Sequence, residues 1–254
     1  MTIIALYSIK GGVGKTAACV NLAHLAAAER SSVLLCDLDP QGSATFYFRM
    51  RPKAKYSVRK FIKGRKGMEK AIRETDYQGL DVLPADLSYR HLDIRLNGFS
   101  KPRRRLGQWL AEFKDRYDYI FLDCPPNMTL VSENVFTAAD AILVPLIPTT
   151  LSKLTYQTLK RFFDESGLDR TRLHPFFSMV EPRKQMHRQT IQEMTAATAH
   201  LLNTTIPYRA EVEKMGFHRA PLTDYLPASQ GAKAFSKLWN EVSAIVSKAH
   251  THGH

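Results

Sequence analysis

The chain has 254 residues, of which 44% are hydrophobic, and its formal net charge at pH 7 is +12. This length and apolar content suit one globular domain with a substantial core, and they exclude a spanning apolar helix, because no apolar run approaches the roughly 20 residues required. The excess positive charge makes a polyanion, either nucleic acid or an anionic membrane, the first candidate partner.

The start of the chain predicts a strand, a glycine loop and a helix in direct succession. Residues 3–7 are apolar, residues 10–16 read KGGVGKT, and residues 17–26 have a helical composition. This is the context of a phosphate-binding loop, because glycines let the backbone approach phosphate oxygens and a helix N-terminus carries partial positive charge. Lys15 is expected to reach the β- and γ-phosphates, and the Thr16 hydroxyl to ligate Mg²⁺. The usual pattern has glycine where Ile9 stands, and a second lysine, Lys10, stands at the loop entrance.

Two further apolar runs end in acidic residues. Residues 32–36 lead into Asp37 and Asp39, whose alternate positions point the same way in an extended chain. Residues 119–122 lead into Asp123, the arrangement of a Walker B strand, whose acid would hold the water shell of Mg²⁺. Ligands of open parallel sheets bind at the carboxyl edge, so these acids are expected near the glycine loop.

The remaining pattern predicts an α/β protein with a doubly wound, mostly parallel sheet and helices on both faces. We expect one domain over residues 1–254, and a first strand that leaves no room for a signal peptide. Further strands are expected over 80–84, 141–146 and 175–180, helices over 58–63, 68–73, 103–113, 154–163, 189–202 and 231–248, and a loop region from 206. The cysteines are interpreted as reduced core thiols of a cytosolic protein: Cys19, Cys36 and Cys124.

The positive charge is concentrated in one stretch. Residues 49–73 hold eleven Lys and Arg residues against Glu69 alone, a net charge of +10. This stretch predicts either a nucleic-acid contact or a solvated surface segment. The C-terminal histidines, His250, His252 and His254, are interpreted as a polar terminus rather than a metal site.

Four segments together resemble the ParA/MinD family of deviant Walker A P-loop ATPases. Residues 10–16 resemble its deviant Walker A box, 37–45 its second motif, 117–126 its third and 229–235 a C-terminal signature. The closest group is the short ParA/Soj-like partition ATPases. One departure is Ala17, because many relatives have threonine there, whose hydroxyl contacts the α-phosphate.

The resemblance implies a cytoplasmic, nucleoid-associated ATPase that binds ATP and Mg²⁺ as a sandwich homodimer. Such a dimer binds non-specific DNA, and a ParB-like partner stimulates hydrolysis to position a plasmid, a chromosome region or a protein cargo. The implied catalytic residues are Lys10, which would reach across the dimer, Lys15 and Asp39, which would orient the attacking water. The implied nucleotide-binding residues are Lys10, Gly11, Gly12, Val13, Gly14, Lys15, Thr16, Ala17 and Pro207. The implied metal residues are Thr16, Asp37 and Asp123, and the implied DNA-binding residues are Lys184, Arg188, Arg209, Arg219 and Lys233.

Two alternatives follow from other features. An apolar stripe in the last helix, from Leu238 to Val246, permits a MinD-like membrane-associated ATPase if it faces lipid rather than the core. A metabolic enzyme of the same fold is the other alternative. An iron protein would need a second cysteine near Cys124, and residues 80–110 contain none. A synthetase would need a substrate pocket that the sequence does not reveal.

Overall fold

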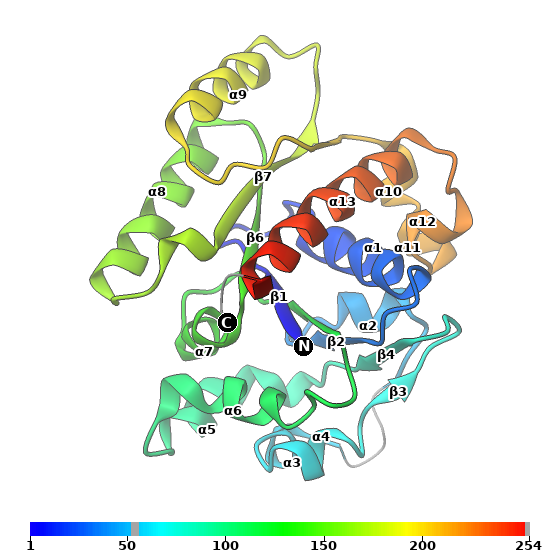
Figure 1. Cartoon of the computed structure of the whole chain (residues 1–254), viewed down its shortest axis with the longest axis vertical. Coiled ribbons are helices and arrows are strands. Elements are labelled where there is room, and N and C mark those ends of the chain that lie inside the picture. Colours follow the sequence, from blue (N-terminus) through cyan, green and yellow to red (C-terminus); the bar gives the residue numbers. More distant parts are fainter. Residues whose placement is uncertain (52–55, 252–254) are drawn as a thin grey trace.

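The computed structural model describes residues 1–51 and 56–251, so Lys53 and Lys55 of the basic stretch and two of the terminal histidines, His252 and His254, lie outside the described residues. All described strands join one eight-stranded sheet with the order β3-β4-β2-β5-β1-β6-β7-β8 (Figure 1). Neighbouring strands are parallel except β3 and β4. The strands are β1 (Thr2–Leu6), β2 (Val33–Asp37), β3 (Arg73–Glu74), β4 (Leu80–Leu83), β5 (Tyr119–Asp123), β6 (Ala141–Leu146), β7 (Leu173–Val180) and β8 (Thr205–Pro207).

Helices cover both faces of the sheet, and each face has its own apolar core. This arrangement explains why the central strands are almost continuously apolar, since a strand covered on both sides has no solvent-facing row. The first face carries α1 (Lys15–Ala28), α2 (Ser43–Tyr47), α10 (Ala210–Glu213), α11 (Met215–His218), α12 (Leu222–Tyr225) and α13 (Gln230–Thr251). The second carries α3 (Val58–Phe61), α4 (Arg65–Met68), α5 (Leu92–Asn97), α6 (Arg105–Ala111), α7 (Leu130–Ala138), α8 (Thr150–Glu165) and α9 (Gln185–Ala197).

The predicted doubly wound sheet is confirmed, and so are its predicted strands. Three predicted helices were wrong in their bounds. The helix expected over 68–73 ends at Met68, and the chain enters β3 at Arg73. The helix expected over 103–113 begins as a 3₁₀ turn (Pro102–Arg104) and continues as α6 to Ala111. The helix expected over 189–202 ends at Ala197, because Leu202 turns into the first-face core and its N–H bonds to Pro175 O.

Other secondary-structure predictions failed where the segments are too short to show a clear hydrophobic periodicity. The loop region expected from 206 instead opens with strand β8, since Ile206 is buried beside β7. Strand β3 and helices α2, α5, α7, α10, α11 and α12 were not predicted. The start of α7 is stabilised by a reciprocal capping box between Thr129 and Ser132. The three cysteines are buried and free, as expected of core thiols.

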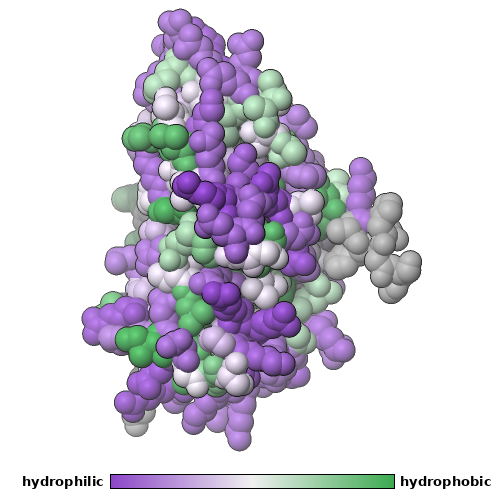
Figure 2. All heavy atoms as spheres, turned by 90° about the vertical axis from the view of Figure 1, so that its left-hand side faces the viewer, coloured by the Kyte–Doolittle hydropathy of each residue, from purple (hydrophilic) through white to green (hydrophobic). Residues whose placement is uncertain are grey.

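Figure 2 shows one side of the molecule, where hydrophilic side chains surround several small, separate apolar areas. No extended apolar area is visible on this side. Among the helices that the structure describes, none combines the length and apolarity needed to cross a membrane. The apolar stripe of α13 packs inward, because Leu238, Trp239, Val242 and Val246 are at most 3% exposed. The indole N–H of Trp239 also donates to Glu29, the residue that follows α1, at 2.8 Å. The stripe therefore belongs to the core.

Candidate active site

The loop between β1 and α1 lies at the carboxyl edge of the sheet and leaves its backbone open. Gly12 and Gly14 have φ angles of +71° and +89°, which favour glycine. Gly14 is the N-cap of α1 and has no side chain that could accept hydrogen bonds from the first turn. The backbone N–H groups of this turn can therefore donate to a bound ligand. A Cβ placed at Gly11 or Gly12 would meet no atom within 4 Å. This open, N–H-lined turn fits a phosphate group.

Lys15 is held inside this loop. Its side chain is only 7% exposed, and its Nζ donates to the carbonyl oxygen of Lys10 at 3.3 Å. Burial lowers the pKa of this ammonium, while the neighbouring acidic groups, of which Asp123 has the largest influence, act in the opposite direction. The lysine is thus positioned, with a single backbone partner, to neutralise an incoming anion.

Asp37 and Asp123 end two adjacent strands at the same register position of β2 and β5. Both side chains are 0% exposed, and burial raises the pKa of each carboxyl group. Asp37 is well supported: its Oδ2 accepts hydrogen bonds from Thr45 N at 2.8 Å and Thr45 Oγ1 at 2.7 Å, and its Oδ1 accepts one from Asp39 N at 3.3 Å. The α2 residue Thr45 therefore fixes the orientation of Asp37.

Asp123 is different, because neither of its carboxylate oxygens has a hydrogen-bond partner among the described residues. Burial is the main cause of its raised pKa, Asp37 adds to it, and the neighbouring Thr16 hydroxyl and Lys15 ammonium oppose it. A buried carboxylate without a partner is costly unless a cation completes its surroundings. With Thr16 and Asp37 beside it, this donor set consists of oxygens, the ligands that Mg²⁺ prefers.

Asp39 stands between this acidic pair and the opening. Its Oδ1 accepts from Gln41 N at 2.9 Å, and its carbonyl oxygen accepts from Gly42 N at 2.9 Å. These bonds form a tight turn that ends at Gly42, whose φ is +68°. The turn fixes the half-buried Asp39 side chain and leaves its Oδ2 available to a ligand. Asp39 lines the same cavity as the glycine loop, so it can hold a water molecule beside a bound phosphate.

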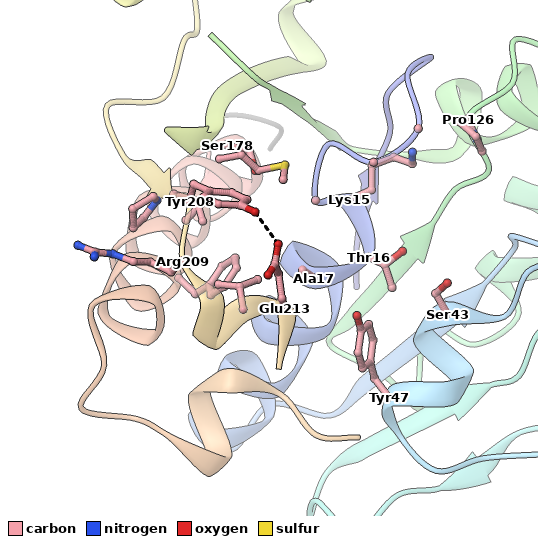
Figure 3. Close-up of a pocket in the computed structure, with 18 of the residues that line it drawn as sticks. Lys15, Thr16, Ala17, Ser43, Tyr47, Pro126, Ser178, Tyr208, Arg209 and Glu213 are labelled. Atoms are coloured by element: carbon pink, nitrogen blue, oxygen red, sulfur yellow. Dashed lines mark hydrogen bonds between the residues drawn. The ribbon is translucent and has the colours of Figure 1, made fainter. Parts of the chain in front are cut away.

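A cavity of about 380 Å³ joins these parts to the C-terminal segment (Figure 3). One wall is the loop from Gly11 to Ala17, and another is the β7–β8 region with Ser178, Pro207 and Tyr208. The Tyr208 hydroxyl donates to Glu213 at 2.7 Å, which holds α10 against this wall. Pro207 lies on this second wall, the Pro207 wall, with the apolar residues Met179, Ile206 and Phe235, which suit contact with an adenine ring.

Comparisons with known proteins agree with this geometry. A family model described as "AAA domain" matches residues 1–168. The sporulation initiation inhibitor protein Soj of Bacillus subtilis (strain 168) is 30% identical over 251 residues, covering 95% of this chain and 98% of that protein. The chain belongs to the ParA/Soj family of ATPases.

Two solved structures show how widely this ParA/Soj fold is used. A putative plasmid partition protein from Borrelia burgdorferi B31, bound to AMPPNP, superposes with a TM-score of 0.81 at 21% identity, covering 97% of this chain and 99% of that one. Cobyrinic acid a,c-diamide synthase from Mycobacterium smegmatis, with a bound ATP analogue and magnesium, has a TM-score of 0.77 at 26% identity, covering 94% and 93%. Both confirm the P-loop fold, and the second shows that this fold also carries synthases.

The DNA-binding residues expected from the ParA/Soj resemblance do not form one cluster. Lys184 pairs with Glu181 at 2.5 Å, and Arg188 donates to the carbonyl oxygen of Pro182 at 2.8 Å, both at the start of α9. The other three, Arg209, Arg219 and Lys233, lie on the first face of the sheet. Arg209 donates a hydrogen bond to the side-chain oxygen of Gln230.

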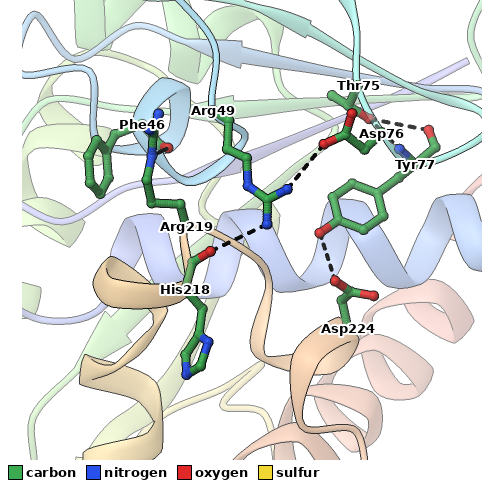
Figure 4. A network of polar contacts seen from close by, with 8 residues as sticks. All are labelled: Phe46, Arg49, Thr75, Asp76, Tyr77, His218, Arg219 and Asp224. Carbon is green, nitrogen blue, oxygen red and sulfur yellow. Dashed lines mark hydrogen bonds and ion pairs between the residues drawn. The ribbon is translucent and has the colours of Figure 1, made fainter.

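Arg219 is engaged by the fold rather than free (Figure 4). Its guanidinium lies 4.6 Å from the ring centre of Phe46 in α2, and its Nε donates to the Phe46 carbonyl oxygen at 3.2 Å. Beside it, Arg49 donates to the carbonyl oxygen of His218 and pairs with Asp76, each at 3.4 Å. These contacts tie α2, and with it the Asp37 loop, to the segment that carries the Pro207 wall.

The sequence-based interpretation missed several residues of this site. It quoted Thr45 within a motif without a role, and it did not find Ser178 or Tyr208. It also missed Asn21 of α1, a buried amide whose Oδ1 accepts from Thr223 N at 3.0 Å and which thereby anchors α12. A polar residue within an otherwise apolar helix was the one available signal for Asn21.

Proposed function

We propose that this protein is a Mg²⁺-dependent ATPase that positions DNA or a protein cargo by switching between nucleotide states. The observation that carries the proposal is the convergence of Lys15, Thr16 and Asp39 on one glycine-lined cavity, with the carboxyl group of Asp123 buried beside Lys15 and Thr16. The ATP analogue and magnesium named for similar structures support the same ligands here.

The residues divide the work of phosphoryl transfer, which needs positioning and charge neutralisation more than covalent chemistry from the protein. The backbone from Gly11 to Thr16 binds the phosphates, and Lys15 neutralises the β- and γ-oxygens. Bound Mg²⁺ would supply further neutralisation of the developing charge, with Thr16, Asp37 and Asp123 around it. Asp39 orients the attacking water and accepts its hydrogen bond. The Pro207 wall holds the base.

Lys10 has a different place in the proposal. It is exposed at the loop entrance and forms no ion pair among the described residues, while its carbonyl oxygen is occupied by Lys15. A lysine presented outward beside the phosphate loop suits contact with the phosphates of a second copy. We propose an ATP-dependent homodimer with Lys10 acting in trans, so that dimer formation and hydrolysis are coupled.

The proposed output is non-specific DNA binding by the ATP dimer, in a cytoplasmic protein that associates with the nucleoid and is released by a ParB-like partner. Arg209, Lys233, Lys184 and Arg188 are the proposed phosphate contacts. Arg219 has a smaller share, because its guanidinium is stacked on Phe46. A MinD-like membrane role loses its sequence basis, since the α13 stripe is buried.

The test is binding of a mixed-sequence DNA duplex with ATP and Mg²⁺, with ADP, and without nucleotide, over a salt series. We expect the ATP state to bind more tightly and to weaken steeply with salt, because phosphate contacts release counterions. Lys10→Ala is expected to lose the ATP-dependent increase while keeping ATP binding.

Equal binding in all three states would contradict ATP-switched DNA binding. ATP turnover with no DNA binding in any state would favour the synthetase alternative. The likeness to a diamide synthase is the observation that supports this alternative.

A further inference from the structure

A set of free cations lies on the outer side of α3, α4 and α6, away from the nucleotide cavity. We define the α3–α6 basic face by residues that are all exposed and form no ion pair among the described residues: Arg59, Lys60, Lys63, Lys66, Lys70, Lys101, Arg104 and Lys114. All lie on the second face of the sheet, whereas the glycine loop and α1 lead into the first.

The face is held as one surface by contacts between its elements. Arg65 of α4 donates to the Glu112 carbonyl oxygen at the end of α6 at 2.8 Å, and its guanidinium lies 5.7 Å from the ring centre of Phe113. Gly64 packs so closely on Trp109 of α6 that a Cβ would come within 2.7 Å of the indole ring. Gly67 packs on Lys60 of α3, where a Cβ would lie 1.8 Å from the carbonyl oxygen. These close contacts hold α4 against both α3 and α6.

The acidic groups within this surface do not neutralise it. Glu69 is paired with Arg65 at 2.7 Å, and Arg65 is not counted in the face. Glu112 and Asp115 at the end of α6 are exposed and also raise the pKa of Arg65, so they reduce the positive charge of this surface by two without pairing with any of its eight cations. The eight cations of the face are left without anionic partners in the described chain. Such a concentration of like charge is unfavourable unless a polyanion binds.

We propose that the α3–α6 basic face is a second, nucleotide-independent binding surface for duplex nucleic acid. Six of its eight cations are lysines, which contact phosphates as point charges without reading bases. They project from several short elements, as suits successive phosphates of a rigid duplex. A membrane would need a wider apolar area, and near this face only Leu87 and Ile94 stand out as exposed aliphatic side chains.

This surface goes beyond the proposed ATP switch. The phosphate contacts proposed for the switch would hold DNA only in the ATP dimer, whereas the α3–α6 basic face is complete in a single chain. It would keep the ADP-bound or nucleotide-free protein weakly associated with DNA between cycles, and it would let one dimer touch two duplex segments.

The experiment uses the full chain and a fluorescent mixed-sequence duplex of about 30 base pairs, over about 50–300 mM KCl. The basic-face variant carries Lys60→Gln, Lys63→Gln and Lys66→Gln. The matched control loses the same charge elsewhere through Lys160→Gln, Arg161→Gln and Lys237→Gln on α8 and α13. Without nucleotide, the basic-face variant is expected to bind about tenfold more weakly, with a salt slope smaller by about 2 to 3, whereas the control stays within about twofold.

Equal losses in the two variants, or no binding of the unaltered protein without nucleotide, would overturn the proposal. Binding to anionic phosphatidylglycerol vesicles but not to duplex would replace nucleic acid with membrane, and equal competition by polyglutamate at equal charge would replace it with an acidic protein. ATP turnover checks that the basic-face variant is folded. Lys15→Ala separates the two proposals, because it is expected to abolish the ATP-dependent increase and leave nucleotide-free binding intact.

Discussion

The Thr45 side chain and the Asp37 carboxylate form a paired contact that fixes one wall of the metal site. Thr45 donates to Asp37 Oδ2 from both its backbone N–H and its hydroxyl, at 2.8 and 2.7 Å. The same hydroxyl oxygen accepts from Ala85 N at 2.8 Å. One hydroxyl thus joins the end of β2, helix α2 and the segment after β4. The orientation of Asp37 depends on α2 being in place.

Thr45→Val removes this hydroxyl while keeping the shape of the side chain. Asp37 loses a donor and Ala85 N loses its acceptor, both in buried surroundings, so we expect a loss of about 1–3 kcal/mol in the free energy of unfolding. The Mg²⁺ concentration needed for half-maximal ATP turnover should rise as well. Urea unfolding and a magnesium titration measure the two effects. Thr45→Ser keeps the hydroxyl and should lie near the unaltered protein, and a Thr45→Val variant of unaltered stability would contradict the role assigned to this contact.

Lys15 and Asp39 are expected to separate ATP binding from ATP turnover. Lys15→Ala removes the buried ammonium at the phosphate loop, so ATP affinity should be lost. Asp39→Ala leaves that loop intact and removes only the group proposed to orient water, so affinity should persist while turnover falls by about a hundredfold or more. Equilibrium binding of a fluorescent ATP analogue and steady-state phosphate release test the pair. Normal turnover in Asp39→Ala would remove Asp39 from the mechanism.

Gly14 is the position where the loop can least tolerate a side chain. Its φ is +89°, and a Cβ would stand 2.9 Å from Ser178 Oγ of β7. Gly14→Ala should lower the free energy of unfolding by about 1–3 kcal/mol, measured without nucleotide. Gly11→Ala is the control, because its Cβ would meet no atom within 4 Å. Adding Ser178→Gly should recover the steric part of the loss only. Equal stability of the two alanine variants would show that the loop adjusts freely.

The sequence was sufficient for the six longer strands and the acids because each has a local cause, whereas the short strands β3 and β8 were missed. Asp37 and Asp123 follow continuous apolar runs, and parallel pairing places them at one register position. Thr45 and Ser178 could not be assigned in this way, since their partners are set by how α2 and β7 pack against distant segments. The resemblance named Arg219 for DNA binding, but it could not show that a left-handed backbone at φ +50° directs this side chain onto Phe46. The α9 boundary failed because Leu202 serves the core of the other face.

His174 predicts a dependence of stability on acid pH. Burial, with His200 nearby, lowers its pKa to about 4, and its Nδ1 has no hydrogen-bond partner among the described residues. Because the unfolded chain binds this proton near pH 6.5 and the folded chain only near pH 4, stability should fall as the pH drops between these values, by about 3 kcal/mol. His174→Phe should flatten this part of the stability profile, measured by urea unfolding. His91→Asn, at an exposed histidine, is the control for the loss of an imidazole.

The carboxylate of Asp123 is expected to lower the stability of the nucleotide-free protein and to strengthen the binding of ATP with Mg²⁺. Both its oxygens are buried without a hydrogen bond of ordinary geometry in the described chain, and the Thr16 hydroxyl and Lys15 ammonium offset only part of the cost of burial, so Asp123→Asn removes a charge that the fold satisfies poorly. The free energy of unfolding without nucleotide should therefore stay equal or rise by about 1–3 kcal/mol, while the rise in Tm on adding ATP and Mg²⁺ should be lost. Asp37→Asn is the matched comparison, because its carboxylate accepts three hydrogen bonds and its loss should destabilise the protein even without nucleotide. If both variants lose the same stability, the carboxylate of Asp123 is satisfied within the folded chain, and the case for a cation beside it fails.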